Sequence, residues 1–189
     1  MLEHTPFSDF MTPMDPVSPD VTNHVIDLLS MFHDKYETEI DRGLDYLKRS
    51  QKPDGAWYGR WGVNNIYGTG LVLVSLNAAG EDMKQKYVQN AVKWLKAHQN
   101  PDGGWVESCR SYDDPSCCGR GESTASQTAL ALLGFIAAGE APDPNVQRGI
   151  AYLVHNQQSN GAWLEEAFIG TRFPRAFYCD TSFLKYTFL

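Results

Sequence analysis

The sequence has 189 residues, enough for one domain or for a piece of a larger one, and 42% of them are hydrophobic. Its net charge of −7 and the lack of a Lys/Arg block argue against a nucleic-acid partner. The longest apolar stretches fall short of the roughly 18–20 residues that a membrane-spanning helix needs.

The N-terminal segment, residues 1–19, is predicted to be irregular because the first twenty residues contain four prolines. A first helix is expected over Val21–Phe32, with Asp20 or Thr22 as its N-cap. Two further helices rich in small residues are expected over Thr69–Ala79 and Thr124–Ala138. No segment shows a convincing alternating pattern that would predict a β-strand.

Three segments of the chain repeat one pattern, in which an aromatic-Leu pair precedes a Gln and a Trp follows that Gln. The segments are YLKRSQKPDGAW (46–57), WLKAHQNPDGGW (94–105) and YLVHNQQSNGAW (152–163). Apolar residues upstream of each Gln recur at helical spacing, and a Gly-containing turn then ends the helix. The Gln can satisfy backbone groups at the helix end, and the Trp can cover the turn. We call these segments clamp 1 (51–57), clamp 2 (99–105) and clamp 3 (157–163).

The clamps divide the chain into helix pairs, each with an amphipathic helix, expected outside, and a more apolar helix, expected inside. Repeated helix pairs predict an α-solenoid or an α/α barrel. Small residues on the inner helices favour close packing around an axis. The predicted fold is therefore all-α, an α/α barrel of helix-pair repeats that this chain forms only in part.

The clamps resemble the QW motifs of the terpene cyclase/mutase family, and longer segments resemble squalene–hopene cyclases in the same order along nearly the whole chain. The segments are PFSDF (6–10), DVTNHV (20–25), QKPDGAWYGRWGVNNIYGTG (51–70), HQNPDGGW (98–105), CRSYDDP (109–115) and ASQTALAL (125–132). The resemblance implies two α/α barrel domains around a hydrophobic cavity. It identifies residues 1–189 as a partial C-terminal domain of such a cyclase.

The resemblance also implies an activity, the cyclisation of squalene to hopene-type triterpenes through carbocations after protonation of a terminal alkene. In the family, the acid is the central aspartate of a DxDD motif, upstream of the position where this chain begins, and no such motif occurs here. We therefore expect that the chain needs the missing half with that motif as a partner, and that it is inactive alone. Arg172 and Arg175 depart from small residues of the family pattern.

Three residues match catalytic positions of the family. The His of DVTNHV, here His24, partners the aspartate acid in the family; its structural alternative is a surface or capping histidine. Asp20 resembles an acidic residue near the catalytic centre, although helix capping alone would explain it. Tyr67 matches a tyrosine of the network that reprotonates the acid, and core packing is its alternative.

Five further residues match positions that bind the substrate in the family. Trp61 corresponds to a tryptophan of the cavity wall, whereas Phe173 and Phe177 correspond to phenylalanines that face late carbocations. For these three aromatic residues, ordinary core packing is the alternative. Phe7 and Ser8 match the region that narrows the substrate channel.

No cofactor is expected, and the spacing of Cys and His residues fits no standard zinc pattern. The ligand implied by the resemblance is squalene or a related isoprenoid. Its lipid nature implies a cytoplasmic protein that associates with lipid or with a membrane surface. The competing hypothesis is a non-catalytic helical-repeat module that binds an isoprenoid or a protein partner.

Overall fold

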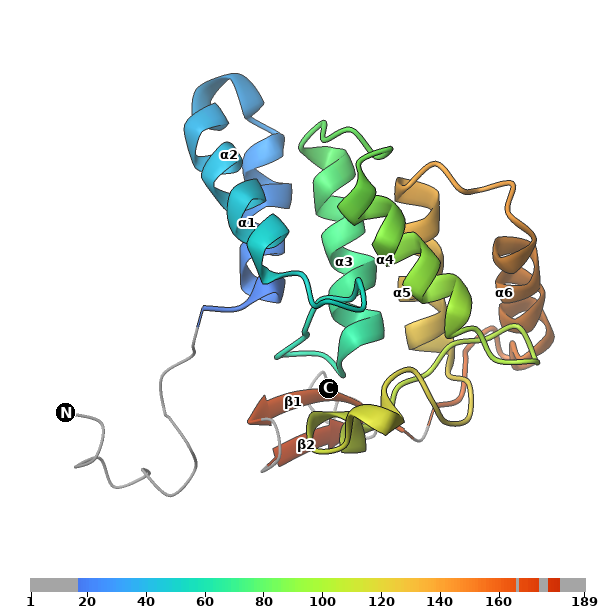
Figure 1. Cartoon of the computed structure of the whole chain (residues 1–189). Coiled ribbons are helices and arrows are strands. Elements are labelled where there is room, and N and C mark those ends of the chain that lie inside the picture. The colour runs from blue at the N-terminus through green and yellow to red at the C-terminus, as the bar shows by residue number, and fades with distance from the viewer. Residues whose placement is uncertain (1–16, 166, 174–176, 181–189) are drawn as a thin grey trace, which may run out of the picture.

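The computed structural model describes residues 17–165, 167–173 and 177–180 (Figure 1). Its helices follow one another in pairs joined by the clamps. They are α1 (Pro19–Ser30), α2 (His33–Ser50), α3 (Asn65–Ala78), α4 (Lys86–Ala97), α5 (Ala125–Ala137) and α6 (Pro144–His155). Two short 3-10 helices, η3 (Cys109–Tyr112) and η4 (Pro115–Cys117), lie in the long connection between α4 and α5.

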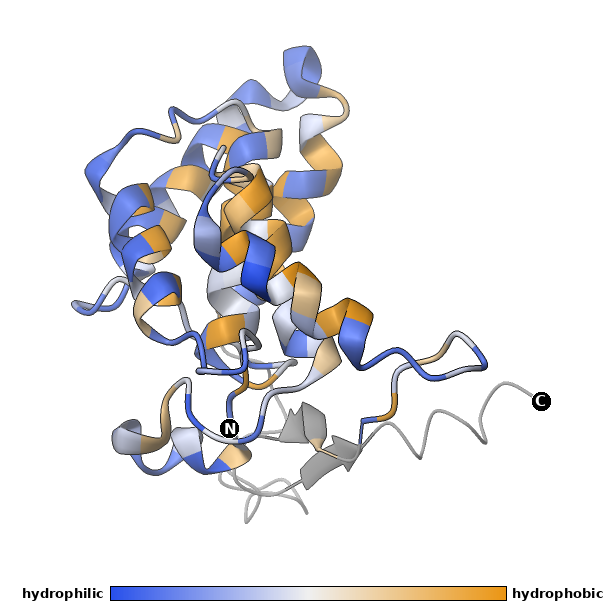
Figure 2. Cartoon of the chain, turned by 90° about the vertical axis from the view of Figure 1, so that its right-hand side faces the viewer, coloured by the Kyte–Doolittle hydropathy of each residue, from blue (hydrophilic) through white to orange (hydrophobic). Residues whose placement is uncertain are grey.

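The helices form two layers. α3 packs between α1 and α5 in the inner layer, and each inner helix also packs against the outer helix that follows it, α2, α4 or α6. The first pair and α6 lie at opposite ends of this array (Figure 1). Apolar residues run through the centre of the stack, where the inner helices lie (Figure 2). The predicted helical fold of paired repeats is confirmed.

Small residues let the inner helices approach closely, as predicted. A Cβ atom added to Gly70 would lie 2.5 Å from the carbonyl oxygen of Leu130, and one added to Gly134 would lie 3.0 Å from the Cα of Gly70. α3 and α5 therefore meet backbone to backbone at these glycines. Larger side chains at either position would force the two helices apart.

The clamps work as the sequence suggested. The Gln51 amide donates to the carbonyl of Gly55 within its own turn (2.8 Å), and the Trp57 indole N–H donates to the carbonyl of Leu47 (2.8 Å). Clamp 2 repeats these two bonds from Gln99 (2.8 Å) and from Trp105 (2.9 Å). The Trp57 and Trp105 side chains are both fully buried. Clamps 1 and 2 thus each close the end of an outer helix and place a large apolar ring in the core.

The structure corrects three predictions about the ends of elements and about strands. The N-cap of the first helix is Ser18, followed by Pro19 at the first helical position, and is neither Asp20 nor Thr22. α3 starts four residues earlier than expected, at Asn65. A short antiparallel hairpin, β1 (Phe168–Phe173) and β2 (Phe177–Asp180), occurs where no strand was predicted. Its register shifts twice, which blurs the alternation that would have indicated it.

No helix in the described part of the chain is long and apolar enough to span a membrane. Residues 1–16 of the predicted irregular segment 1–19 lie outside the described residues.

Candidate functional site

The centre of the candidate site is the carboxylate of Asp20, in the first turn of α1, which is almost completely buried. One of its oxygens accepts the backbone N–H groups of Arg60 (2.8 Å) and Trp61 (2.7 Å). The other accepts the backbone N–H of Val21 (3.1 Å). A buried charge needs such partners, because water is not available to solvate it. Asp20 therefore fixes the loop that precedes α3 to the start of α1.

His24 lies one helical turn after Asp20 on α1, and its side chain is exposed. Residues four positions apart share one side of a helix, so His24 lies on the same side of α1 as Asp20. An exposed histidine at this position can interact with a group that comes from another segment or another molecule. The catalytic role of His24 stays a prediction from the resemblance.

Tyr67, in the first turn of α3, packs against the same loop. Cβ atoms added to Gly59 and Gly62 would lie 2.6 Å and 2.3 Å from its ring, so only glycine fits at both positions. Burial, and secondarily the charge of Asp20, raises the pKa of Tyr67 to about 12. The hydroxyl therefore stays protonated at neutral pH and can donate a hydrogen bond. Trp61, held by Asp20 through its backbone, leaves 46% of its surface exposed.

Sequence reasoning missed two residues that support the same loop, Tyr112 in the connection between α4 and α5 and Asn64 within the loop itself. The hydroxyl of Tyr112 lies 2.8 Å from the carbonyl oxygen of Gly59 and 3.0 Å from that of Gly62. Burial raises its pKa, so this hydroxyl also stays protonated. Tyr112 lies in the segment CRSYDDP, which resembles squalene–hopene cyclases, but the resemblance did not assign a role to this tyrosine. Asn64, the residue before α3, donates to Ser111 (3.1 Å) and accepts from Gly59 (3.3 Å).

Glu107 is the third residue that sequence reasoning missed. Its buried carboxylate accepts from the side chain of Asn65 (2.6 Å) and from the backbone N–H of Ile66 (2.9 Å). A negative charge at a helix N-terminus is favourable, and here it satisfies one of the N–H groups without a partner inside the helix. Glu107 therefore explains why α3 begins at Asn65. The sequence shows only that an acidic residue stands two positions after clamp 2. It does not show that this residue lies close to the start of α3 in the folded chain.

The remaining predicted site residues either do not belong to this cluster or lie outside the residues that the structure describes. Phe173 and Phe177 face each other as Cα partners at the end of the β1–β2 hairpin, where the description is limited to the backbone. Phe7 and Ser8 lie outside the described residues. Across the described ranges, no group of three His, Cys, Asp or Glu side chains could hold a metal ion.

The structure thus brings together Asp20, His24, Trp61 and Tyr67 at the N-terminal ends of α1 and α3. The cluster offers an exposed imidazole, a protonated phenol and an aromatic ring on a rigid frame. These groups can orient an acid and face a cation. A frame of backbone hydrogen bonds keeps them in place before any ligand arrives.

Known proteins are similar to this sequence along nearly all of its length. The family model described as the squalene-hopene cyclase C-terminal domain matches residues 1–189. A squalene–hopene cyclase from Alicyclobacillus acidocaldarius is 49% identical over 98% of this chain, which spans 30% of that protein. A dammaradiene synthase from Dryopteris crassirhizoma is 37% identical over 94% of the chain and 29% of its own length. The chain therefore spans about a third of the relatives that it matches.

Solved structures share the fold. An ent-copalyl diphosphate synthase from Streptomyces platensis superposes with a TM-score of 0.65 at 20% identity, over 89% of this chain and 32% of its own. The type II terpene cyclase MstE from Scytonema, solved as a variant in complex with geranylgeranyl dihydroxybenzoate, superposes with a TM-score of 0.60 at 21% identity. That likeness covers 92% of this chain and 46% of MstE. The likeness to these structures shows the fold. The family match over residues 1–189, with the 49% identity to the squalene–hopene cyclase from Alicyclobacillus acidocaldarius, shows that the chain belongs to the squalene–hopene cyclase family.

Proposed function

We propose that this chain is the C-terminal part of a triterpene cyclase that converts squalene to hopene-type pentacyclic products. The observation that carries this proposal is the buried Asp20 carboxylate, which binds the backbone of Trp61 one helical turn before the exposed His24, in a chain 49% identical to a squalene–hopene cyclase. In the proposed reaction, a carboxylic acid protonates the terminal alkene. The π-bonds then close successive rings, and the final cation loses a proton or takes up water.

An alkene is a feeble base, so the acid must be strong and must be reloaded after each turnover. His24 is proposed to orient that acid and to favour its carboxylate form after proton transfer. The acid itself would come from a segment with a DxDD motif, which this sequence lacks. Tyr67, whose pKa is raised to about 12, can donate a hydrogen bond to the water that returns the proton.

The aromatic ring of Trp61 suits the next stage of the reaction. A carbocation cannot be hydrogen-bonded, but the face of an aromatic ring attracts a cation without attacking it as a nucleophile would. The corresponding role for Phe173 and Phe177 stays a prediction from the resemblance. Because the substrate is a lipid, we also propose that the protein works in the cytoplasm at a membrane or lipid surface.

The test joins this chain to the part of the Alicyclobacillus acidocaldarius relative that precedes the matched region, and supplies squalene. We expect cyclised triterpenes from the fusion protein, detected by gas chromatography with mass spectrometry, and none from the chain alone. His24→Ala should lower the rate by about 10²-fold or more. His33→Ala, which removes another exposed histidine at the start of α2, should leave the rate unchanged.

Two results would contradict the proposal. Product from the chain alone would refute the need for an acid from elsewhere, and equal rates in the two histidine variants would refute the role of His24. A fusion protein that folds and binds squalene without cyclising it would favour the alternative, a helical-repeat module that binds an isoprenoid.

A further inference from the structure

A glutamate stands two positions after the Trp of clamp 2 and of clamp 3, and each one binds the start of an inner helix. Glu107 accepts the backbone N–H of Ile66 on α3 (2.9 Å). Glu165 accepts the backbone N–H of Ser126 on α5 (3.0 Å), and its other oxygen accepts the hydroxyl of that serine (2.5 Å). Ile66 and Ser126 are each the second residue of their helix. The same contact therefore recurs, and it gives a carboxylate to an N–H group that has no partner inside the helix.

The first helix pair makes this contact with the carboxylate on the other partner. Two positions after the Trp of clamp 1 stands Gly59, which has no side chain, and the second residue of α1 is Asp20. Asp20 accepts the backbone N–H groups of Arg60 and Trp61, the two residues after Gly59. In all three pairs, a carboxylate thus joins the start of the inner helix to the segment that follows the clamp of the same pair. We call this contact the junction of the pair.

The segment held by each of the first two junctions contributes to the candidate site. The segment after clamp 1 contains Trp61, and the segment after clamp 2 contains Tyr112, whose hydroxyl lies against two carbonyls of the same loop. The segment after clamp 3 enters the β1–β2 hairpin at Phe168, three residues after Glu165. The third junction therefore sets the point from which the hairpin leaves the helix array.

The hairpin lies at the same end of the array as the candidate site. Figure 1 shows β1 and β2 at the end where α3 and α5 begin. The second and third junctions are connected there, because the buried Gln127, the residue after Ser126, donates to the backbone carbonyl of Glu107 (3.0 Å). Hydrogen bonds thus run from the start of α3 to the start of α5, where Glu165 holds the segment that enters the hairpin. The hairpin is therefore tied to the frame that carries the site.

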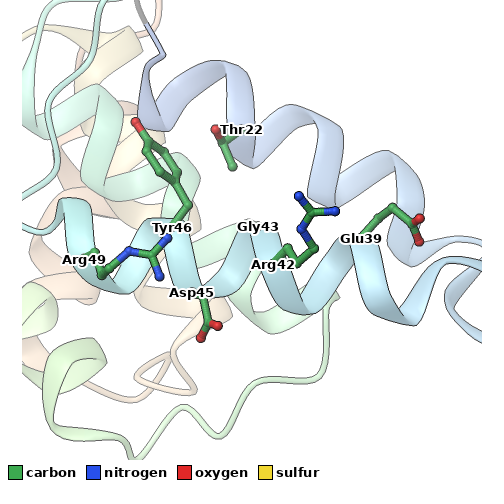
Figure 3. A pocket seen from close by; sticks show the side chains of 7 residues that line it. All are labelled: Thr22, Glu39, Arg42, Gly43, Asp45, Tyr46 and Arg49. Carbon is green, nitrogen blue, oxygen red and sulfur yellow. The ribbon is translucent and has the colours of Figure 1, made fainter.

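A hydrocarbon substrate suits this end of the array better than it suits the pocket between α1 and α2. That pocket has a volume of about 450 Å³, and charged side chains dominate its lining (Figure 3). They are Glu39, Arg42, Asp45 and Arg49. Small molecules bind where hydrophobic and aromatic side chains predominate, so these charges offer little to a hydrocarbon. Trp61 instead offers an exposed aromatic ring near the start of α3.

We infer that Glu165 is a positioning residue for the proposed cyclisation, and that it acts through the β1–β2 hairpin. By tying the hairpin to the start of α5, it keeps the two strands at the site, where they exclude water from the growing cation. A cation that meets water early loses a proton to it, or adds it and then loses a proton, and ring closure stops. Glu165 touches no reacting atom in this role, yet it sets how many rings close. The inference rests on the proposed cyclase function.

Hydrogen exchange of the 189-residue chain, read by mass spectrometry, tests the hold on the hairpin. Glu165→Ala removes the acceptor of two hydrogen bonds, so the amides of β1 and β2 should exchange at least about tenfold faster. Ser126→Ala removes the hydroxyl but keeps the backbone N–H, and should have a smaller effect. The matched control is Glu122→Ala, which removes an exposed acid in the connection before α5 and should leave these amides unchanged.

The mixture of products that the fusion protein makes from squalene tests the function of this hold. Glu165→Ala should raise the share of incompletely cyclised products at least about threefold, and should lower pentacyclic product more than squalene consumption. Glu165→Gln keeps one oxygen as an acceptor and should recover part of the pentacyclic share. Adding Ser126→Ala to Glu165→Ala should change the mixture no further, because the contact is already lost. Glu122→Ala should give the wild-type mixture.

The outcomes separate this inference from the function on which it rests. A wild-type fusion that cyclises squalene, with the same mixture of products from Glu165→Ala, would overturn the inference and leave the cyclase function standing. Unchanged exchange of β1 and β2 in Glu165→Ala would overturn it as well. If Glu165 only capped α5, its loss would lower stability without changing the mixture. A wild-type fusion that folds and binds squalene without cyclising it would overturn both.

Discussion

At the scale of single residues, the site depends on carboxylates whose partners are mainly backbone groups. Asp20 accepts three backbone N–H groups, and Glu107 accepts one backbone N–H and one side-chain amide. Sequence analysis found Asp20 through its place in DVTNHV but could not foresee that it binds a loop forty residues away. It missed Glu107, because the partner of a buried charge is set by tertiary contacts and leaves no local pattern.

Replacing Asp20 tests its structural role. Asp20→Ala leaves the N–H groups of Arg60 and Trp61 without their acceptor, and we expect the free energy of unfolding to fall by about 2–4 kcal/mol. Asp20→Asn keeps one oxygen as an acceptor and should lose less. Urea denaturation followed by circular dichroism measures the difference. Asp27→Ala, an exposed change on the same helix, is the control, and an equal loss in both alanine variants would contradict the assignment.

At the scale of elements, the clamp is the unit that the sequence encodes most clearly. Its Gln, Gly and Trp stand at fixed offsets, and each has a local partner, so three copies could be recognised without a structure. The helices that carry apolar residues at helical spacing were predicted for the same reason. The hairpin was not, because six- and four-residue strands with two register shifts give too short a pattern.

The clamps themselves offer a matched comparison. Gln99 bonds its own turn, the next outer helix and the guanidinium of Arg148, whereas the one bond seen for Gln157 in the described residues is to its own turn. Gln99→Ala should therefore lower the free energy of unfolding by about 2–3 kcal/mol and Gln157→Ala by about 1 kcal/mol. Chemical denaturation followed by circular dichroism measures both. Equal effects would mean that the hydrogen bonds between helix pairs do not contribute to the free energy of unfolding.

At the scale of the whole molecule, the chain is a short linear array in which each helix pair contacts its neighbours. Its stability should then depend on how many neighbours each pair has. Among the described helices, the central pair, α3 and α4, has a pair on each side, whereas the first and last pairs have one neighbour each. The repeat spacing predicted this architecture, but it could not show which helix pairs have a single neighbour within the described residues.

Hydrogen exchange read by mass spectrometry can resolve these differences. In dilute solution, we expect the amides of α3 and α5, which meet at Gly70 and Gly134, to exchange most slowly. Those of α6 and of the first pair should exchange sooner, because in the described structure each packs against a neighbouring pair on one side. Exchange at one common rate throughout the helices would instead indicate a single cooperative unit.

The clamps also have a direction, since both docked clamps bind a helix pair that comes later in the chain. The side chain of Gln51 can form its bond to the carbonyl of Tyr87 only after α4 has been made, and that of Gln99 can bond Asn145 only after α6 has been made. On a ribosome, the chain would therefore present each finished outer helix with an open clamp, and that clamp could close only when the next pair had emerged. Nascent chains long enough for α4 to have left the ribosome, but too short for α6 to have done so, should hold Trp57 buried and Trp105 exposed. Synthesis would lock the array pair by pair, from the N-terminus onward.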